Sequence, residues 1–240
     1  SVSYTVLLKA LSRSRRRDSI RIASYLFDDM INRGIEADVH VFTILLFIYS
    51  KHASIQKTQE VFQLMIDYGI EPSIVTYTQL LNMYGKSHDP DASKYIFDIF
   101  KRIKLSSMSY DTVAYSSLLS AISSSNNTDT SAERALEILQ TMRTKGVEID
   151  TQVITIVIGI LSKSEKDYSS HCFSLYDELI QPTPVSFTTM LNYIKNVRRK
   201  ESSGNLLQSR TYLDKIFSQM VKTDYVLDAQ SLKSLASALA

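Results

Sequence analysis

One short pattern recurs six times along this 240-residue sequence: an aromatic or branched apolar residue followed at once by a small hydroxyl residue. The six pairs are Tyr4-Thr5, Phe42-Thr43, Tyr77-Thr78, Tyr115-Ser116, Ile154-Thr155 and Phe187-Thr188. Their first members are separated by 38, 35, 38, 39 and 33 residues. A near-constant period of this size is typical of repeat proteins, in which each repeat packs only against its neighbours.

The apolar spacing within each repeat is helical and not alternating. In the third repeat Tyr77, Leu80, Leu81 and Tyr84 lie at i, i+3, i+4 and i+7, which places them on one face of a helix. A second apolar pair, with three-residue spacing, predicts a partner helix in every repeat. These pairs are Phe27/Met30, Phe62/Met65, Phe97/Phe100, Leu139/Met142, Tyr176/Leu179 and Phe217/Met220. Because one helical pair cannot bury both stripes, the sequence predicts an all-α solenoid of stacked pairs.

Turn and capping residues mark the ends of the predicted helices. Glycine follows three of the second helices, where it suits a left-handed C-cap; these are Gly34, Gly69 and Gly146. Aspartate precedes several first helices, where a carboxylate can cap the N-terminus; these are Asp38, Asp111, Asp150 and Asp228. Polar insertions predict longer turns at 123–131 and 198–207.

Composition excludes several classes of protein. Gly 6 and Pro 4 are too few for an all-β fold, which needs frequent turns. The single Cys172 excludes an intrachain disulfide or a cysteine zinc cluster. No apolar run reaches the length of about 18 residues that indicates a membrane span. Since no metal-site spacing of histidines and no Gly-rich phosphate loop occurs, we expect no cofactor, no metal and no enzymatic activity.

The unit 39–73 carries the features that identify a family. It has 35 residues, places Met65 in its second helix, ends GIEPS, and is followed by the opening IVTYT of the next unit. It resembles the pentatricopeptide repeat. The tetratricopeptide repeat instead has a small residue at the position of Met65. The resemblance implies a right-handed superhelical solenoid. Its units would be 1–38, 39–73, 74–111, 112–150, 151–183 and 184–228, with a partial first helix at 229–240.

The resemblance also implies where a ligand would bind. In this family the first helices line a surface for single-stranded RNA, and two residues of each repeat read one base. The corresponding pairs are Thr5 with Asp38, Thr43 with Ser73, Thr78 with Asp111, Ser116 with Asp150, Thr155 with Thr183, and Thr188 with Asp228. Thr or Ser with Asp suggests guanine in the family, so a purine-rich target is expected. Ser73 and Thr183 depart from the usual Asp or Asn, which leaves their repeats without an assigned base.

Two further sets of side chains follow from the same resemblance. The second residue of each unit would pack against base faces: Val2, His40, Val75, Val113, Gln152 and Val185. Cations at the end of the first helix would contact phosphates: Arg13, Lys51, Lys86 and Lys163. Their alignment along one surface would allow a chain of net charge +2 to bind RNA with an affinity that falls as salt rises.

Structural interpretations of these residues stay open beside the functional ones. Aspartate caps a helix whether or not RNA binds, and a lysine at a helix C-terminus complements the helix dipole. The basic segments 13–17 and 195–200 could hold phosphates or be solvated loops. The leading expectation is sequence-selective RNA binding in mitochondrial RNA metabolism, with the compartment inferred only from the family. The alternative is a helical-repeat scaffold that binds proteins or associates with the mitochondrial ribosome.

Overall fold

The computed structural model describes residues 2–14, 18–51, 55–87, 92–105, 110–124, 128–199 and 206–222. Every regular element in these residues is an α-helix, so the predicted all-α class is confirmed. The chain divides into two compact units, Ser1–Tyr110 and Asp111–Ala240.

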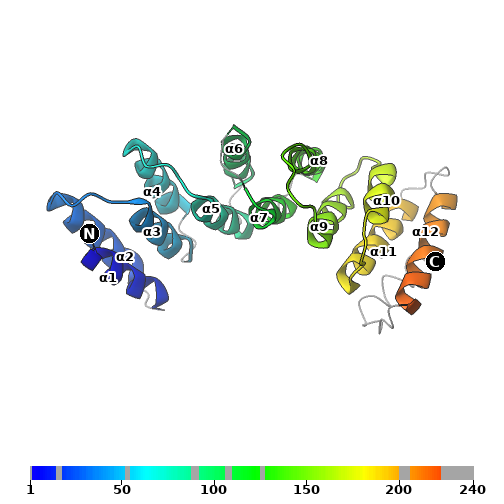
Figure 1. Cartoon of the computed structure of the whole chain (residues 1–240), viewed down its shortest axis with the longest axis horizontal. Helices are drawn as coiled ribbons and strands as arrows, with labels where there is room; N and C mark the ends of the chain where they lie inside the picture. The colour runs from blue at the N-terminus through cyan, green and yellow to red at the C-terminus, as the bar shows by residue number, and fades with distance from the viewer. Residues whose placement is uncertain are drawn as a thin grey trace. The chain divides into compact units, whose positions relative to one another are not determined.

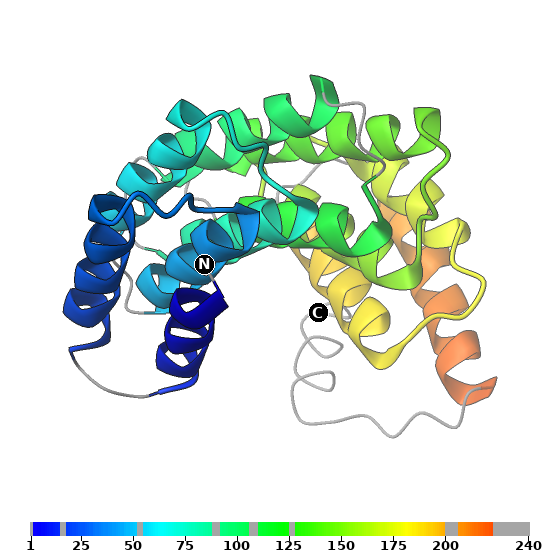
Figure 2. The same cartoon turned by 60° about the vertical axis from the view of Figure 1, so that its left-hand side comes forward.

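Unit 1 consists of three helical pairs, which Figure 1 shows in blue to green. Its helices are α1 (Val2–Arg13), α2 (Ser19–Asn32), α3 (Val39–Lys51), α4 (Ile55–Asp67), α5 (Ile74–Lys86) and α6 (Ala92–Leu105). We call the first helix of each pair the A helix and the second the B helix. The A helices α1, α3 and α5 pack side by side, while α2 and α4 each pack against their own A helix and the next one. Figure 2 shows these pairs from another direction.

Unit 2 repeats this arrangement. Its helices are α7 (Thr112–Ser123), α8 (Thr128–Thr144), α9 (Thr151–Leu161), α10 (Ser169–Asp177), α11 (Pro184–Arg199) and α12 (Leu206–Lys222). The A helices α7, α9 and α11 form the central row, and α8 and α10 each contact the A helices on both sides. The B helix α10 has 9 residues against 17 in α8, so the fifth pair is the shortest on its B side.

The residue that defines the repeat lies in the core in all repeats but the first, where Tyr4 is half-buried. Five of these side chains are almost completely buried: Phe42, Tyr77, Tyr115, Ile154 and Phe187. The methionines of the B helices are buried as well, which confirms that the predicted stripes are core packing. Removing a side chain of this size from water stabilises the fold by about 1.5–3 kcal/mol.

Glycine ends three B helices in a left-handed conformation, as predicted. The φ angles are 69° at Gly34, 70° at Gly69 and 67° at Gly146. In each case the next residue donates a backbone hydrogen bond to the carbonyl of a B-helix methionine. These bonds run from Ile35 to Met30 at 3.1 Å, from Ile70 to Met65 at 3.0 Å and from Val147 to Met142 at 2.9 Å. A Cβ at these glycines would touch nothing, so the positive φ, and not a lack of space, favours glycine.

The last residue of five repeats caps the A helix that follows. Three carboxylates accept a backbone N–H through Oδ1: Asp38 from Val41 at 2.9 Å, Asp111 from Ala114 at 2.9 Å and Asp150 from Val153 at 2.8 Å. Ser73 and Thr183 cap through their hydroxyls, which accept from Thr76 at 3.2 Å and from Ser186 at 3.3 Å. The predicted aspartate caps are therefore confirmed at these positions, whereas Asp228 lies outside the described residues.

The predicted turn at 123–131 is wrong over its second half, because α8 already begins at Thr128. The polar composition of this segment predicts a turn, but hydrogen bonds from a neighbouring loop to Asp129 allow the segment to be helical. Asp129 accepts hydrogen bonds from the Ser164 hydroxyl and from the backbone N–H of Glu165. A carboxylate in the first helical turn also complements the helix dipole. Of the other predicted turn, 198–207, both ends belong to helices, since α11 ends at Arg199 and α12 begins at Leu206; residues 200–205 lie outside the described residues.

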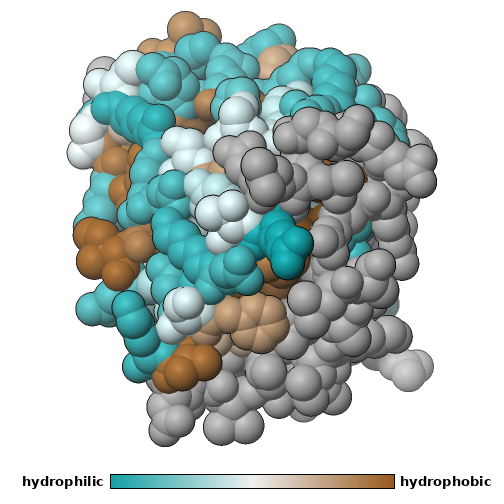
Figure 3. All heavy atoms as spheres, turned by 90° about the vertical axis from the view of Figure 1, so that its right-hand side faces the viewer, coloured by the Kyte–Doolittle hydropathy of each residue, from teal (hydrophilic) through white to brown (hydrophobic). Residues whose placement is uncertain are grey.

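The surface offers neither a membrane span nor a metal site in the part that the structure describes. None of the described helices is both long and apolar enough to cross a bilayer. Nor do three or more His, Cys, Asp or Glu side chains gather there in a way that could hold a metal ion. Cys172 is buried on α10, and burial raises the pKa of its thiol, which keeps the thiol protonated. On the face shown in Figure 3, hydrophilic side chains surround small groups of hydrophobic ones.

Candidate nucleic-acid interface

The A helices contain no acidic residue. The sequences of α1, α3, α5, α7, α9 and α11 have neither Asp nor Glu. Their basic residues are Lys9, Arg13, Lys51, Lys86, Lys195, Arg198 and Arg199. Most B helices, in contrast, mix both signs. Acidic side chains would repel a polyanion. In each unit the A helices, which are free of acidic residues and carry cations, therefore form the surface that a nucleic acid would favour.

The positions that the family resemblance implies do not reveal this segregation of charge. It is visible in the printed sequence once the A and B helices are compared as two sets. Lys9 and Lys195 belong to the candidate surface for this reason and not because of a motif.

The predicted base-packing residues lie in the first turn of the A helices and are exposed. The exposed fractions are 75% for Val2, 56% for Val75, 66% for Val113 and 65% for Val185. His40 and Gln152 occupy the same position of their helices and are also exposed. An apolar side chain is therefore exposed at the same repeat position in four of the six A helices, and its contact with a base stays a prediction.

The predicted reading hydroxyls are bonded to their own helices. Each of four donates to the backbone carbonyl four residues earlier: Thr43 at 2.6 Å, Thr78 at 2.9 Å, Thr155 at 2.6 Å and Thr188 at 2.9 Å. Ser116 is buried and Thr5 is half-buried. A hydroxyl that donates to the backbone keeps its lone pairs, so it can still accept a hydrogen bond from a base N–H.

The two residues of one predicted reading pair are linked through the hydroxyl of a third residue. The hydroxyl of Thr43 lies 3.2 Å from that of Thr76, which in turn lies 3.0 Å from the hydroxyl of Ser73. Thr76 thus connects Thr43 with Ser73 in unit 1. Thr78 belongs to unit 1 and Asp111 to unit 2, and Asp228 lies outside the described residues, so the pairs of Thr78 and of Thr188 stay predictions.

The carboxylates of the other pairs keep some capacity to bind a ligand. Capping uses Oδ1 of Asp38, Asp111 and Asp150, and their second oxygens have no hydrogen-bond partner among the described residues. Asp38 and Asp111 are exposed, and Asp150 is half-buried. An ionised carboxylate accepts hydrogen bonds only, so each free oxygen suits an N–H on the edge of a base.

Two predicted phosphate contacts have a structural role as well. Lys51 donates to the carbonyls of Ser12 and Ser14 at 3.3 and 2.8 Å, and Lys163 donates to the carbonyl of Ser123 at 2.7 Å. These carbonyls lie at the C-terminal end of the preceding A helix, where backbone acceptors lack partners within the helix. These lysines therefore link neighbouring A helices through hydrogen bonds. The sequence does not show this, because the acceptors lie about one repeat away.

The remaining predicted cations are available. Arg13 and Lys86 are exposed, and neither has a hydrogen-bond or ion-pair partner among the described residues. In unit 2 the position equivalent to Lys163 is Asn196, which donates to the carbonyl of Ser162 at 3.2 Å. At this repeat position three side chains, Lys51, Lys163 and Asn196, thus link their A helix to the preceding one. Arg13 and Lys86 make no such contact among the described residues, so their charges are available to a ligand.

A groove of about 360 Å³ lies between the A helices α3 and α5. Phe47, Lys51, Gln79, Asn82 and Lys86 are among the residues that line it. Three of these residues, Phe47, Gln79 and Asn82, are absent from the predicted site. The signal that could have found them is position, since Phe47 and Asn82 both lie five residues after the aromatic that defines their repeat.

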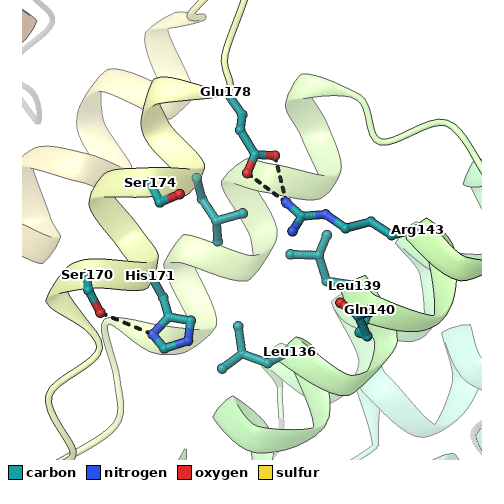
Figure 4. A pocket seen from close by; sticks show the side chains of 9 residues that line it. Leu136, Leu139, Gln140, Arg143, Ser170, His171, Ser174 and Glu178 are labelled. Carbon is teal, nitrogen blue, oxygen red and sulfur yellow. Dashed lines mark hydrogen bonds and ion pairs between the residues drawn. The ribbon is translucent and has the colours of Figure 1, made fainter.

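A second groove, of about 420 Å³, lies between the B helices α8 and α10 (Figure 4). Arg143 donates to both carboxylate oxygens of Glu178, at 2.7 and 2.8 Å. The charges of Arg143 and Glu178 compensate each other. Ser170 and His171, which also line the groove, hydrogen-bond to each other. This groove therefore lacks the surplus of positive charge that a polyanion requires.

Comparisons with known proteins identify the kind of repeat in part of the chain. Two family descriptions match the chain: "Pentatricopeptide repeat domain" over residues 25–87 and "PPR repeat" over residues 75–105. Both descriptions name a repeat, and neither names an enzymatic activity. A search of curated proteins finds no match to this sequence.

Solved structures share the fold. The crystal structure of the pentatricopeptide repeat protein PPR10 from maize matches with a TM-score of 0.58 and 17% sequence identity, over 98% of this chain and 36% of that one. PPR10 in complex with an 18-nt psaJ RNA element matches with a TM-score of 0.53 and 17% identity, over 98% and 37%. This chain thus spans about a third of the length of PPR10. Residues 25–105 thus match descriptions of the pentatricopeptide repeat, and the stacked helical pairs of the chain share the fold of PPR10.

Proposed function

We propose that the A-helix surfaces bind single-stranded RNA. The observation that carries this proposal is the absence of acidic residues from all six A helices, together with exposed apolar side chains and cations on them. PPR10, which shares the fold, has been crystallised with an RNA element. The two findings support the same class of ligand independently.

Each chemical group of a nucleotide has a matching side chain in this proposal. Base faces pack against the exposed valines, as at Val75 and Val113. The base edge meets a hydroxyl and a carboxylate, for example Thr5 and Asp38, and both can accept the N–H groups of guanine. Phosphates meet the available cations Arg13 and Lys86. Because a base edge is free for this contact only when the base is unpaired, the ligand is a single strand.

Binding of this kind acts by occupancy. A bound segment is masked from nucleases and kept out of secondary structure, which would affect the stability, processing or translation of a transcript. Pentatricopeptide repeat proteins are typically organellar, and this supports an organelle, which we propose to be the mitochondrion, as the site of action.

A change at one reading carboxylate is expected to alter base preference without unfolding the protein. Asp150→Asn keeps an N-cap acceptor, because Asn and Asp cap equally well, whereas Asp150→Ala would cost about 1 kcal/mol of stability. The amide brings N–H donors where the carboxylate only accepts, which favours adenine over guanine. Sequencing of RNA selected from a random single-stranded pool is expected to show one guanine position turning to adenine, with a change of about tenfold in preference.

Asp214→Asn on the B helix α12 is the matched control, because Asp214 is exposed and lies outside the A-helix surface. It is expected to leave the selected sequence unchanged. An unchanged preference in Asp150→Asn would contradict its role as a reading residue. Equal affinity for duplex and single-stranded RNA would contradict the proposed function and favour a protein-binding scaffold.

A further inference from the structure

We propose that the groove between α3 and α5 is a subsite for one nucleobase of the bound RNA, formed by Phe47, Gln79, Asn82 and Lys86. This inference rests on the proposed function. The subsite adds a second kind of base contact to the proposed function. Phe47, Gln79 and Asn82, which would hold the base, belong to none of the reading pairs that the family resemblance implies.

Phe47 provides a ring face at the groove. Its side chain is 41% exposed, although large aromatic side chains are usually buried. At the equivalent position the other A helices carry Lys9, Asn82, Ser120, Gly159 and Asn192. Only the pair α3 and α5 thus offers an exposed ring at this position, and ring faces stack on any of the bases.

Gln79 provides an acceptor that lacks a partner. Its Oε1 is buried and has no hydrogen-bond partner among the described residues. Buried acceptors are almost always paired, and an unpaired one destabilises the fold. The residue as a whole is only half-buried, and a terminal amide rotates easily, so its oxygen can turn toward a ligand in the groove. Every nucleobase edge carries an N–H that could donate to it.

Asn82 and Lys86 complete the match to a nucleotide. Asn82 is exposed on the same helix and offers both a donor and an acceptor to the base edge. Lys86 is exposed and has no partner among the described residues, and none of the described residues that line the groove is a carboxylate. A flat ring, a polar edge and a nearby anion are the three features of a nucleotide. The volume of about 360 Å³ also falls within the range of about 300–1,000 Å³ that small-ligand sites occupy.

Two substitutions test the subsite. Both are expected to weaken RNA binding, and one of them is also expected to stabilise the fold. Phe47→Leu keeps apolar bulk but removes the ring, and is expected to weaken binding of a labelled 18-nucleotide single-stranded RNA of random sequence about tenfold. Gln79→Leu removes the unpaired oxygen. It is expected to raise the melting temperature while weakening RNA binding about fivefold, a combination that a purely structural role would not produce.

Tyr25→Ala on the B helix α2 is the matched control, because Tyr25 is an aromatic residue of the same unit and is 68% exposed. Its RNA affinity is expected to equal that of the unmodified protein, as measured by fluorescence anisotropy. If the unmodified protein binds RNA and both Phe47→Leu and Gln79→Leu bind it equally well, the subsite is wrong and the proposed function stands. If the unmodified protein binds no RNA, the proposed function fails and the subsite fails with it.

Discussion

Neutralising three cations of unit 1, by Lys9→Gln, Arg13→Gln and Lys86→Gln together, is expected to weaken RNA binding about 100-fold at 0.1 M salt. Each phosphate contact to a single strand lowers the slope of log affinity against log salt by about 0.7, so three contacts contribute about 2. If the two proteins bind RNA equally at 1 M salt, a difference of about 2 in slope gives an affinity difference of about 100-fold at 0.1 M salt. Titrations at several salt concentrations measure both the affinity and the slope.

The control for this triple variant is a second triple on the B helix α6, Lys94→Gln, Lys101→Gln and Lys104→Gln. It changes the net charge of the chain by the same amount and lies in the same unit. We expect less than about a threefold loss of affinity, because these side chains are not on the A helices. Equal losses in the two triples would mean that only net charge matters, and the assignment of the A-helix surface would then be wrong.

Phe173→Ala is expected to lower the free energy of unfolding of unit 2 by about 3–5 kcal/mol. The side chain of Phe173 is 1% exposed. Its ring stacks on Tyr212 with centroids 4.1 Å apart and meets the edge of Tyr193 at 6.0 Å. The substitution would therefore leave a cavity among α10, α11 and α12. Urea denaturation followed by circular dichroism measures the loss.

The loss should stay local, because the stability of a repeat protein comes from each repeat and its interfaces with neighbours. Hydrogen exchange is expected to speed up in α10, α11 and α12 and to change little in unit 1. Phe97→Ala on α6 is the matched control; its half-buried ring should cost only about 1 kcal/mol. A uniform increase in exchange over both units would show that the chain unfolds as one cooperative body.

Features that depend on local sequence could be predicted before the structure. Gly69 follows the last turn of its helix, and its left-handed conformation depends only on its own backbone. Asp150 precedes an apolar helix and caps it through a residue three positions later. Both signals lie within a few residues of the feature they produce, so the sequence contains all that is needed.

Features that arise from stacking could not be predicted in this way. Lys163 donates to Ser123, 40 residues earlier, and the sequence gives no register for that contact. The groove between Phe47 and Gln79 likewise exists only because α3 and α5 pack side by side. Composition misled the assignment of Asp129 to a turn, since its hydrogen-bond partners Ser164 and Glu165 come from the next helical pair.

Photocrosslinking of a short single-stranded RNA that contains 4-thiouridine, followed by mass spectrometry of the crosslinked peptides, tests most directly whether RNA lies on the A helices. We predict crosslinks to peptides of α1, α3, α5, α7, α9 and α11, including the first-turn positions Val75 and Val113. Crosslinks that map to the B helices, or that are distributed evenly over both sets, would contradict this account.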